Sequence, residues 1–197
     1  ICSGTTFSYT PTSTVSGTIS WTRAAVAGIS EAATSGTGSI SEILTNTSSS
    51  TKTVVYKITL PVNSSGCSKT FDLSVVINSL PTATISGSTA VCSNSTNPTV
   101  TFTGANGIPP YTFTYTINGG ANQTITTATG NSVSLNVSSA NVGSFVYSLV
   151  NVQDASSSSC SQQQSGSATV TINALPVLVV NPPAPVCAPN TVDLTAV

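Results

Sequence analysis

The chain has 197 residues, of which only 5% are charged, and its net charge is −1 at pH 7. This balance excludes the clustered Lys and Arg side chains that bind nucleic acid and the basic patches that bind anionic membranes. No run of about 18 apolar residues is present, so no membrane insertion is expected.

The first part of the chain is predicted to form short β-strands. Four segments have strand character: 5–10, 18–23, 40–46 and 53–60. The last of them is the clearest, because its apolar side chains alternate with polar ones, as in a half-buried strand: Val54, Tyr56, Ile58 and Leu60. A closing strand is expected to turn four side chains inward: Phe71, Leu73, Val75 and Ile77. Residues 24–38 show no helical spacing of apolar residues and are expected to be a loop, with a frayed turn of helix as the alternative.

The second part of the chain continues the same pattern. Further strands are predicted over 99–103, 111–117, 123–127, 133–137, 145–149 and 168–172. The sequence Asn118-Gly119-Gly120 between two of them predicts a tight β-hairpin. No segment with helical periodicity competes, so the chain is predicted to be all-β.

A repeat divides the chain into units. Ile77 and Ile172, Pro81 and Pro176, and Cys92 and Cys187 are each 95 residues apart. A period of this length indicates an array of small domains, and about seven short strands per unit predict an immunoglobulin-like β-sandwich. We expect one sandwich over 1–80 and a second over 81–175, arranged end to end. Residues 176–197 are expected to be the lead-in and first strand (191–196) of a third, truncated repeat, and the chain a window from a longer polypeptide.

Cysteine spacing predicts one disulfide in each unit. The proposed pairs are Cys2–Cys67 and Cys92–Cys160, because a final strand that begins at the pole where the chain enters would bring each pair together. Cys187 is then unpaired within this window, and its partner is expected to lie beyond it. Regular cysteine spacing in a Ser/Thr-rich chain favours an oxidising, extracellular compartment.

Short motifs carry a family resemblance. Ile1-Cys2-Ser3-Gly4-Thr5, Ile19-Ser20-Trp21-Thr22-Arg23 and Gly66-Cys67-Ser68 resemble the PKD-like repeats of secreted surface proteins in the Bacteroidetes group. The segment 107–113 is similar to Ig-like repeats of very large adhesins from the same group, including gliding-motility adhesins. The resemblance implies tandem sandwiches at the cell surface and export by the type IX secretion route. The cysteine placement departs from that of antibody domains, so their inter-sheet bond is not carried over.

Candidate catalytic and metal-binding groups are sparse. The chain has no histidine, and a Ser–His–Asp or Cys–His arrangement therefore cannot form. Glu31 and Glu42 are the only candidates for a glycosidase pair, and we interpret them as two solvated glutamates. Five scattered acidic residues disfavour calcium, which prefers several carboxylates. A Lys–Asn crosslink would use Lys52, Lys57 or Lys69, but these lysines are expected at the surface.

Two aromatic residues are candidates for exposed binding surfaces. Trp21 is predicted to be a core residue rather than a sugar-stacking surface. Tyr111, which follows two prolines, is predicted to brace the hinge between domains, with exposure at a domain pole as the alternative.

The sequence therefore predicts a non-catalytic structural or adhesive module of an extracellular stalk, fibre or adhesin, without a cofactor. Its expected partners are further repeats of the same chain or neighbouring protomers, and surface polysaccharide or other cells. The alternative is an accessory carbohydrate-binding or spacer region of a secreted enzyme.

Overall fold

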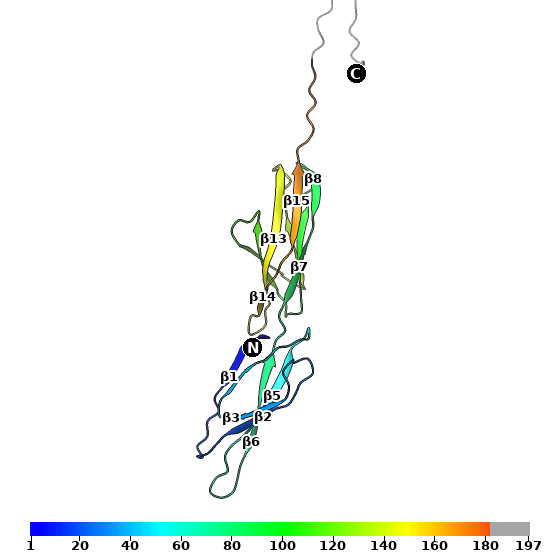
Figure 1. Cartoon of the computed structure of the whole chain (residues 1–197). Coiled ribbons are helices and arrows are strands. Elements are labelled where there is room, and N and C mark those ends of the chain that lie inside the picture. Colours follow the sequence, from blue (N-terminus) through cyan, green and yellow to red (C-terminus); the bar gives the residue numbers. More distant parts are fainter. Residues whose placement is uncertain (182–197) are drawn as a thin grey trace, which may run out of the picture.

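The computed structural model describes residues 1–181, which form two β-sandwich domains joined end to end (Figure 1). The described residues contain strands and no helix. The predicted strand over 191–196 and Cys187 lie outside the described residues.

The first domain has six strands in two sheets. They are β1 (Thr6–Tyr9), β2 (Ser20–Arg23), β3 (Thr34–Thr37), β4 (Ile40–Ile43), β5 (Lys52–Thr59) and β6 (Thr70–Ile77). Strands β1 and β4 pair with each other, and the second sheet has the order β3-β2-β5-β6 with all pairs antiparallel. The core between the sheets consists of Trp21, Ile29, Ile40, Leu44, Val54, Tyr56, Ile58, Val75 and Ile77.

The second domain has nine strands. They are β7 (Thr82–Ser86), β8 (Thr89–Cys92), β9 (Thr99–Ala105), β10 (Thr112–Ile117), β11 (Gln123–Thr126), β12 (Ser132–Asn136), β13 (Gly143–Gln153), β14 (Ser161–Gln163) and β15 (Ser167–Asn173). One sheet has the order β12-β9-β7, and the other has the order β11-β10-β13-β15-β8, with β14 paired to β13. Its core is separate from the first one and is centred on Phe102, Tyr111, Phe113 and Val152.

The alternation predicted for β5 and β6 is observed along most of their length. Val54, Tyr56 and Ile58 are buried, and Val75 and Ile77 of the neighbouring strand β6 are buried on the same face of the sheet. Phe71 is the exception: we predicted it to be inward, but it is 45% exposed. It borders an open hollow at the start of β6, where the Lys69 ammonium lies 5.0 Å from the centre of its ring and leaves it partly exposed.

Segment 24–38 is not the continuous loop that we predicted, because it contains β3. This strand has no apolar side chain that could reveal it in the sequence. The reason is the neighbouring tryptophan: a Cβ on Gly36 would lie 2.5 Å from the Trp21 ring, so only glycine fits there. A strand whose inward position must be glycine has no period-two pattern of apolar residues.

Strands β7 and β8 were also missed, and they show how the chain crosses the second domain. Strand β7 pairs with β9 in one sheet, whereas β8 pairs in parallel with β15 in the other. The switch occurs at Gly87, which has φ 114° and whose added Cβ would lie 2.3 Å from the Thr99 carbonyl oxygen. Glycine is the residue that adopts such a backbone at low cost. The chain therefore changes sheets over two residues.

The Asn118-Gly119 hairpin was predicted correctly. Strands β10 and β11 are antiparallel neighbours, and both turn residues have positive φ, 50° and 70°. That combination matches the right-handed twist of the flanking strands.

Candidate functional site at the domain junction

A disulfide crosses the boundary between the two domains. Cys2 of the first domain bonds to Cys160 of the second, with a Cα–Cα distance of 5.5 Å and a sequence separation of 158. The predicted pairs Cys2–Cys67 and Cys92–Cys160 are therefore wrong. Among the described cysteines, Cys67 and Cys92 carry free, exposed thiols.

The prediction failed because it placed Cys2 beside the wrong end of the final strand. Cys2 pairs in parallel with Asn78, directly after the end of β6. It lies therefore at the pole where the chain leaves the first domain. Cys67 lies in the loop between β5 and β6, at the opposite pole (Figure 1). A bond between Cys2 and Cys67 would have to cross the length of the domain.

The linker between the domains is short and packed. Four residues, 78–81, separate β6 from β7. The Ser79 hydroxyl donates a hydrogen bond to the Asn106 carbonyl of the second domain. Pro81 is buried against Gly107, since a Cβ on that glycine would lie 3.0 Å from the proline Cβ. The packing and the disulfide together restrict bending at the junction.

A buried polar network shapes the first domain's side of the junction. The Asn46 side-chain amide donates to the Ile77 carbonyl at 3.0 Å and to the Ser50 carbonyl at 2.7 Å. The Asn46 backbone N–H donates to the Ser3 hydroxyl at 2.8 Å. Buried polar groups are stable only when such partners are present. The network therefore fixes the end of β6 relative to the segment that carries Cys2.

On the second domain's side of the junction, one carboxylate fixes the local structure. Asp154 is 4% exposed and accepts hydrogen bonds from the Ile108 N–H at 3.1 Å and from the Ser156 hydroxyl at 2.7 Å. Its own N–H donates to the Cys160 carbonyl at 2.9 Å. Asp154 thus holds the loop that presents Cys160. Our sequence reading missed this role, although Asp154 is the only acidic residue in 81–175, which was the available signal.

A polar hollow of about 400 Å³ lies between the domains. Hydroxyl and amide groups make up most of its lining, which includes Thr47, Ser48, Asn106 and Gln162. The lining contains no carboxylate and no aromatic ring, so it offers neither a cation site nor a stacking surface for a sugar.

The two candidate glutamates are not merely solvated, which corrects our interpretation. Glu42 forms a salt bridge with Arg23 at 2.9 Å, in which the arginine side chain is 1% exposed and the glutamate 16%. Glu42 also accepts a hydrogen bond from the Tyr56 hydroxyl at 2.6 Å. Glu31 lies on the other side of the arginine, which donates to the Glu31 backbone carbonyl. The Glu42 carboxylate therefore pairs with the buried Arg23 cation, whereas the Glu31 carboxylate accepts hydrogen bonds from the Ser30 hydroxyl and the Thr45 N–H.

These contacts shift two pKa values. Burial acts to raise the pKa of the Glu31 carboxyl, but hydrogen bonds from Thr45 and Ser30 outweigh it and lower the pKa below its ordinary value. Burial and the hydrogen bond to Glu42 raise the pKa of the Tyr56 hydroxyl.

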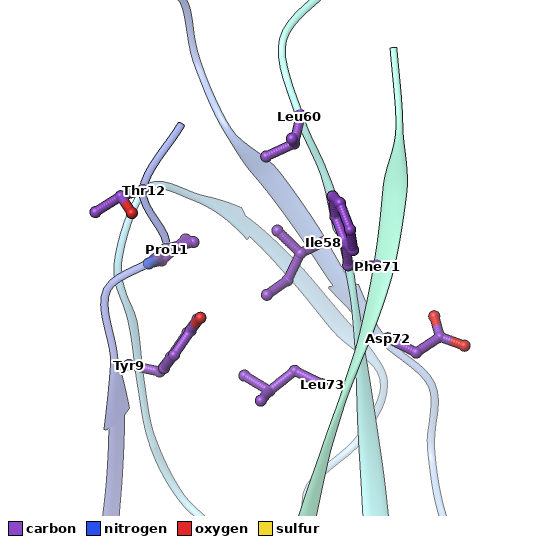
Figure 2. Close-up of a pocket in the computed structure, with 8 residues that line it drawn as sticks. All are labelled: Tyr9, Pro11, Thr12, Ile58, Leu60, Phe71, Asp72 and Leu73. Carbon is purple, nitrogen blue, oxygen red and sulfur yellow. The ribbon is translucent and has the colours of Figure 1, made fainter. Parts of the chain in front are cut away.

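A hollow of about 330 Å³ opens near the far pole of the first domain (Figure 2). Ile58 and Leu73 form its floor, and Tyr9 and Phe71 flank it, as the close-up shows, while Asp72 points away. Both flanking rings are partly exposed, 41% for Tyr9 and 45% for Phe71.

The remaining candidates lie in structural positions. Trp21 is 8% exposed and packs edge-on against Tyr56 at 5.8 Å, which makes it a core residue as predicted. Tyr111 is 1% exposed, and its hydroxyl donates to the Gly107 carbonyl at 2.8 Å. It is therefore a core residue of the second domain that fixes the turn at Gly107, and the predicted exposure at a domain pole is not observed. Lys57 forms an exposed salt bridge with Asp72.

Within residues 1–181, no group of three or more Cys, Asp or Glu side chains gathers where it could hold a metal ion. The described part of the chain also contains no helix long and apolar enough to cross a membrane.

Residues 1–81 match the profile of the PKD-like domain family. Among curated proteins, none matches the chain. The family match covers the first domain, and the strand order and core of that domain are those of a PKD-like, immunoglobulin-type sandwich. A PKD-like domain suggests a structural or adhesive module, and such domains together with a disulfide are typical of extracellular proteins.

Proposed function

We propose that the chain is a segment of an extracellular, cell-surface stalk or adhesin in which consecutive repeats are locked end to end. The observation that carries the proposal is the disulfide between Cys2 and Cys160, which joins two domains instead of stabilising one. A disulfide within one domain stabilises only that domain, whereas a disulfide across a junction fixes the orientation of one domain relative to the next.

The path of tension supports a mechanical role. A force that enters at Cys2 crosses the disulfide to Cys160 and leaves through β14 and β15. Both strands are already extended and paired to β13. The first domain and most of the second therefore lie outside the loaded path. A stalk built in this way transmits force with little lengthening.

The composition supports an exposed position at the surface of a cell. Charged residues are 5% of the chain, so its surface is covered mainly by Ser, Thr and Asn, which are insensitive to salt and pH. The partners that we propose are further repeats or neighbouring protomers, with surface polysaccharide or other cells as adhesive targets. The proposed setting is a Bacteroidetes-type adhesin exported by the type IX route. The module is proposed to be non-catalytic.

Small-angle scattering tests the locked junction. The oxidised chain is expected to give an elongated particle with the domains end to end. The Cys2→Ser variant is expected to show a broader distribution of interdomain distances, because the linker alone then holds the domains. A compact, side-by-side particle for the oxidised chain would contradict the proposal.

A second candidate function is an accessory carbohydrate-binding region of a secreted enzyme. It is favoured by the hollow that Tyr9 and Phe71 flank, because partly exposed aromatic rings stack on sugars. Calorimetric titration with soluble polysaccharides tests it. Binding that is lost in Tyr9→Ala or Phe71→Ala, but retained in the control Val62→Ala, would support this candidate, and the absence of heat from every polysaccharide tried would remove it.

A further inference from the structure

The two free cysteines occupy, each in its own domain, the position of one partner of the interdomain disulfide. Cys2 and Cys92 come early in the sequence of their domains, and we define them as the entry cysteines. Cys67 and Cys160 lie in the loops before the final strands, and we define them as the loop cysteines. We propose that Cys92 forms a disulfide with the loop cysteine of another repeat of this kind, and that Cys67 forms one with the entry cysteine of another. Every junction of the array would then carry the bond seen between Cys2 and Cys160.

The entry cysteines share one backbone environment. Cys2 pairs in parallel with Asn78, and Cys92 pairs in parallel with Asn173. The N–H of the following serine donates to that asparagine carbonyl in both domains, at 2.9 Å for Ser3 and 2.8 Å for Ser93. Each entry cysteine is therefore fixed beside the end of its domain's final strand.

The turns after the entry cysteines also agree. The Cys2 carbonyl accepts hydrogen bonds from the Thr5 N–H at 3.1 Å and its hydroxyl at 2.7 Å. The Cys92 carbonyl accepts the same pair from Ser95, at 3.2 Å and 2.7 Å. The residue before each of these is in the left-handed region, with φ 78° for Gly4 and 60° for Asn94. The two segments thus have the same geometry although their sequences differ.

The loop cysteines share a second environment. Each precedes its domain's final strand and is held by an Asn or Asp residue upstream. The Asn63 N–H donates to the Cys67 carbonyl at 2.9 Å, and the Asp154 N–H donates to the Cys160 carbonyl at 2.9 Å. The side-chain oxygen of each accepts the N–H two residues further on, at 3.0 Å for Asn63 and 3.2 Å for Asp154. Both loops are built to present a cysteine at the same pole.

The surface beside Cys92 is exposed, whereas the equivalent surface beside Cys2 is buried by the second domain. Asn78 is 5% exposed and Pro81 is buried, because the second domain packs on them. Their equivalents Asn173 and Pro176 are exposed. Cys67 and Cys92 lie at opposite ends of the two-domain unit, the first in the β5–β6 loop and the second at the end of β8 (Figure 1). They cannot meet within one copy, so each requires a neighbour.

The chemistry is an exchange between thiols and a small disulfide such as oxidised glutathione. Two cysteine thiols lose two protons and two electrons to form the S–S bond, and the small disulfide takes them up and leaves as two thiols. This inference deepens the proposed function and rests on it for the end-to-end order of repeats. The experiment below measures which cysteines pair, whereas the proposed stalk function is tested by the shape and extension of the chain. Either proposal can therefore fail while the other holds.

The experiment oxidises the folded chain at high concentration in a glutathione buffer, with Cys187→Ser as background. A second copy of the chain supplies the neighbouring repeat. Cleavage after Lys and Arg and before Asp places Cys67 in peptide 58–69 and Cys92 in peptide 72–153. We expect a ladder of covalent oligomers in which the joined pair 58–69/72–153 is several-fold enriched over the same oxidation in urea, where pairing is random.

Two results would overturn the proposal. One is that Cys67–Cys67 and Cys92–Cys92 pairs between copies form as often in the folded chain as in urea, and the other is that the chain stays monomeric at every concentration. Asn63→Ala tests the loop geometry, because it removes the hydrogen bonds that the Asn63 side-chain oxygen accepts from the Ser65 and Cys67 N–H groups, and it is expected to lower the joined pair several-fold. Asn122→Ala, an exposed position in the β10–β11 loop whose side chain has no hydrogen bond to either cysteine loop, is the matched control and should leave the yield unchanged.

Discussion

Reduction of the Cys2–Cys160 bond should release a large, defined length of chain under tension. The two cysteines are 158 positions apart, and their Cα atoms are 5.5 Å apart when bonded. The intervening chain would span roughly 520–570 Å if fully extended at about 3.3–3.6 Å per residue. The oxidised chain should therefore reach a maximum length shorter than that of the reduced chain by about this amount.

Single-molecule pulling between handles at the two ends of the chain measures this difference. Oxidised molecules are expected to lengthen only through the residues outside the disulfide loop, and reduced molecules should show the additional unfolding of the first domain and most of the second. Cys2→Ser should behave like the reduced protein in either buffer, while Cys67→Ser should behave like the oxidised wild type. Equal final lengths with and without reductant would refute the force path that we derive.

The same bond should raise thermal stability. In the chain-entropy account, closing a loop of this size stabilises the folded state by about 5 kcal/mol, and measured gains are usually smaller. Reduction is thus expected to lower the melting temperature of the first domain, which is otherwise joined to the second by the short linker alone.

Three further predictions concern the first domain. Glu42→Gln should lower its free energy of unfolding by about 3–5 kcal/mol, because it leaves the buried Arg23 without its partner, whereas Asp72→Asn, which removes only an exposed salt bridge, should have no measurable effect; urea denaturation compares the two. Tyr56→Ala should cost about 3 kcal/mol through the cavity that it creates, and an unchanged melting temperature would contradict the packing at this position. Because the pKa of Glu31 is lowered on folding, its contribution is present above its unfolded pKa and is lost as pH falls through the folded value, so acid titration should destabilise wild type more than Glu31→Gln.

The sequence was informative wherever burial alternates along a strand. Val54, Tyr56 and Ile58 are inward because an extended backbone turns every second side chain to the same face. The all-β class follows from such runs together with turn residues such as Asn118 and Gly119. These features are local, so short segments of sequence contain them.

The disulfide could not be derived in this way, because pairing depends on which pole each cysteine occupies. The position of Cys2 is set by a parallel pairing with Asn78, a contact between residues far apart in sequence. Similarly, the salt bridge between Arg23 and Glu42 joins two strands of different sheets. Apolar periodicity contains no information about either contact.

Disulfide mapping of the oxidised, unreduced chain tests the central claim most directly. Cleavage after Lys and Arg and before Asp yields Cys2 in peptide 1–23, Cys67 in 58–69 and Cys92 in 72–153, with Cys160 and Cys187 together in 154–192. A further cut after Leu178 separates the last two. We predict a bond between Cys2 and Cys160, which mass spectrometry would detect as 1–23 joined to the Cys160 peptide. Peptide 1–23 joined to 58–69, with 72–153 joined to the Cys160 peptide, would show one bond inside each domain and would contradict the locked junction.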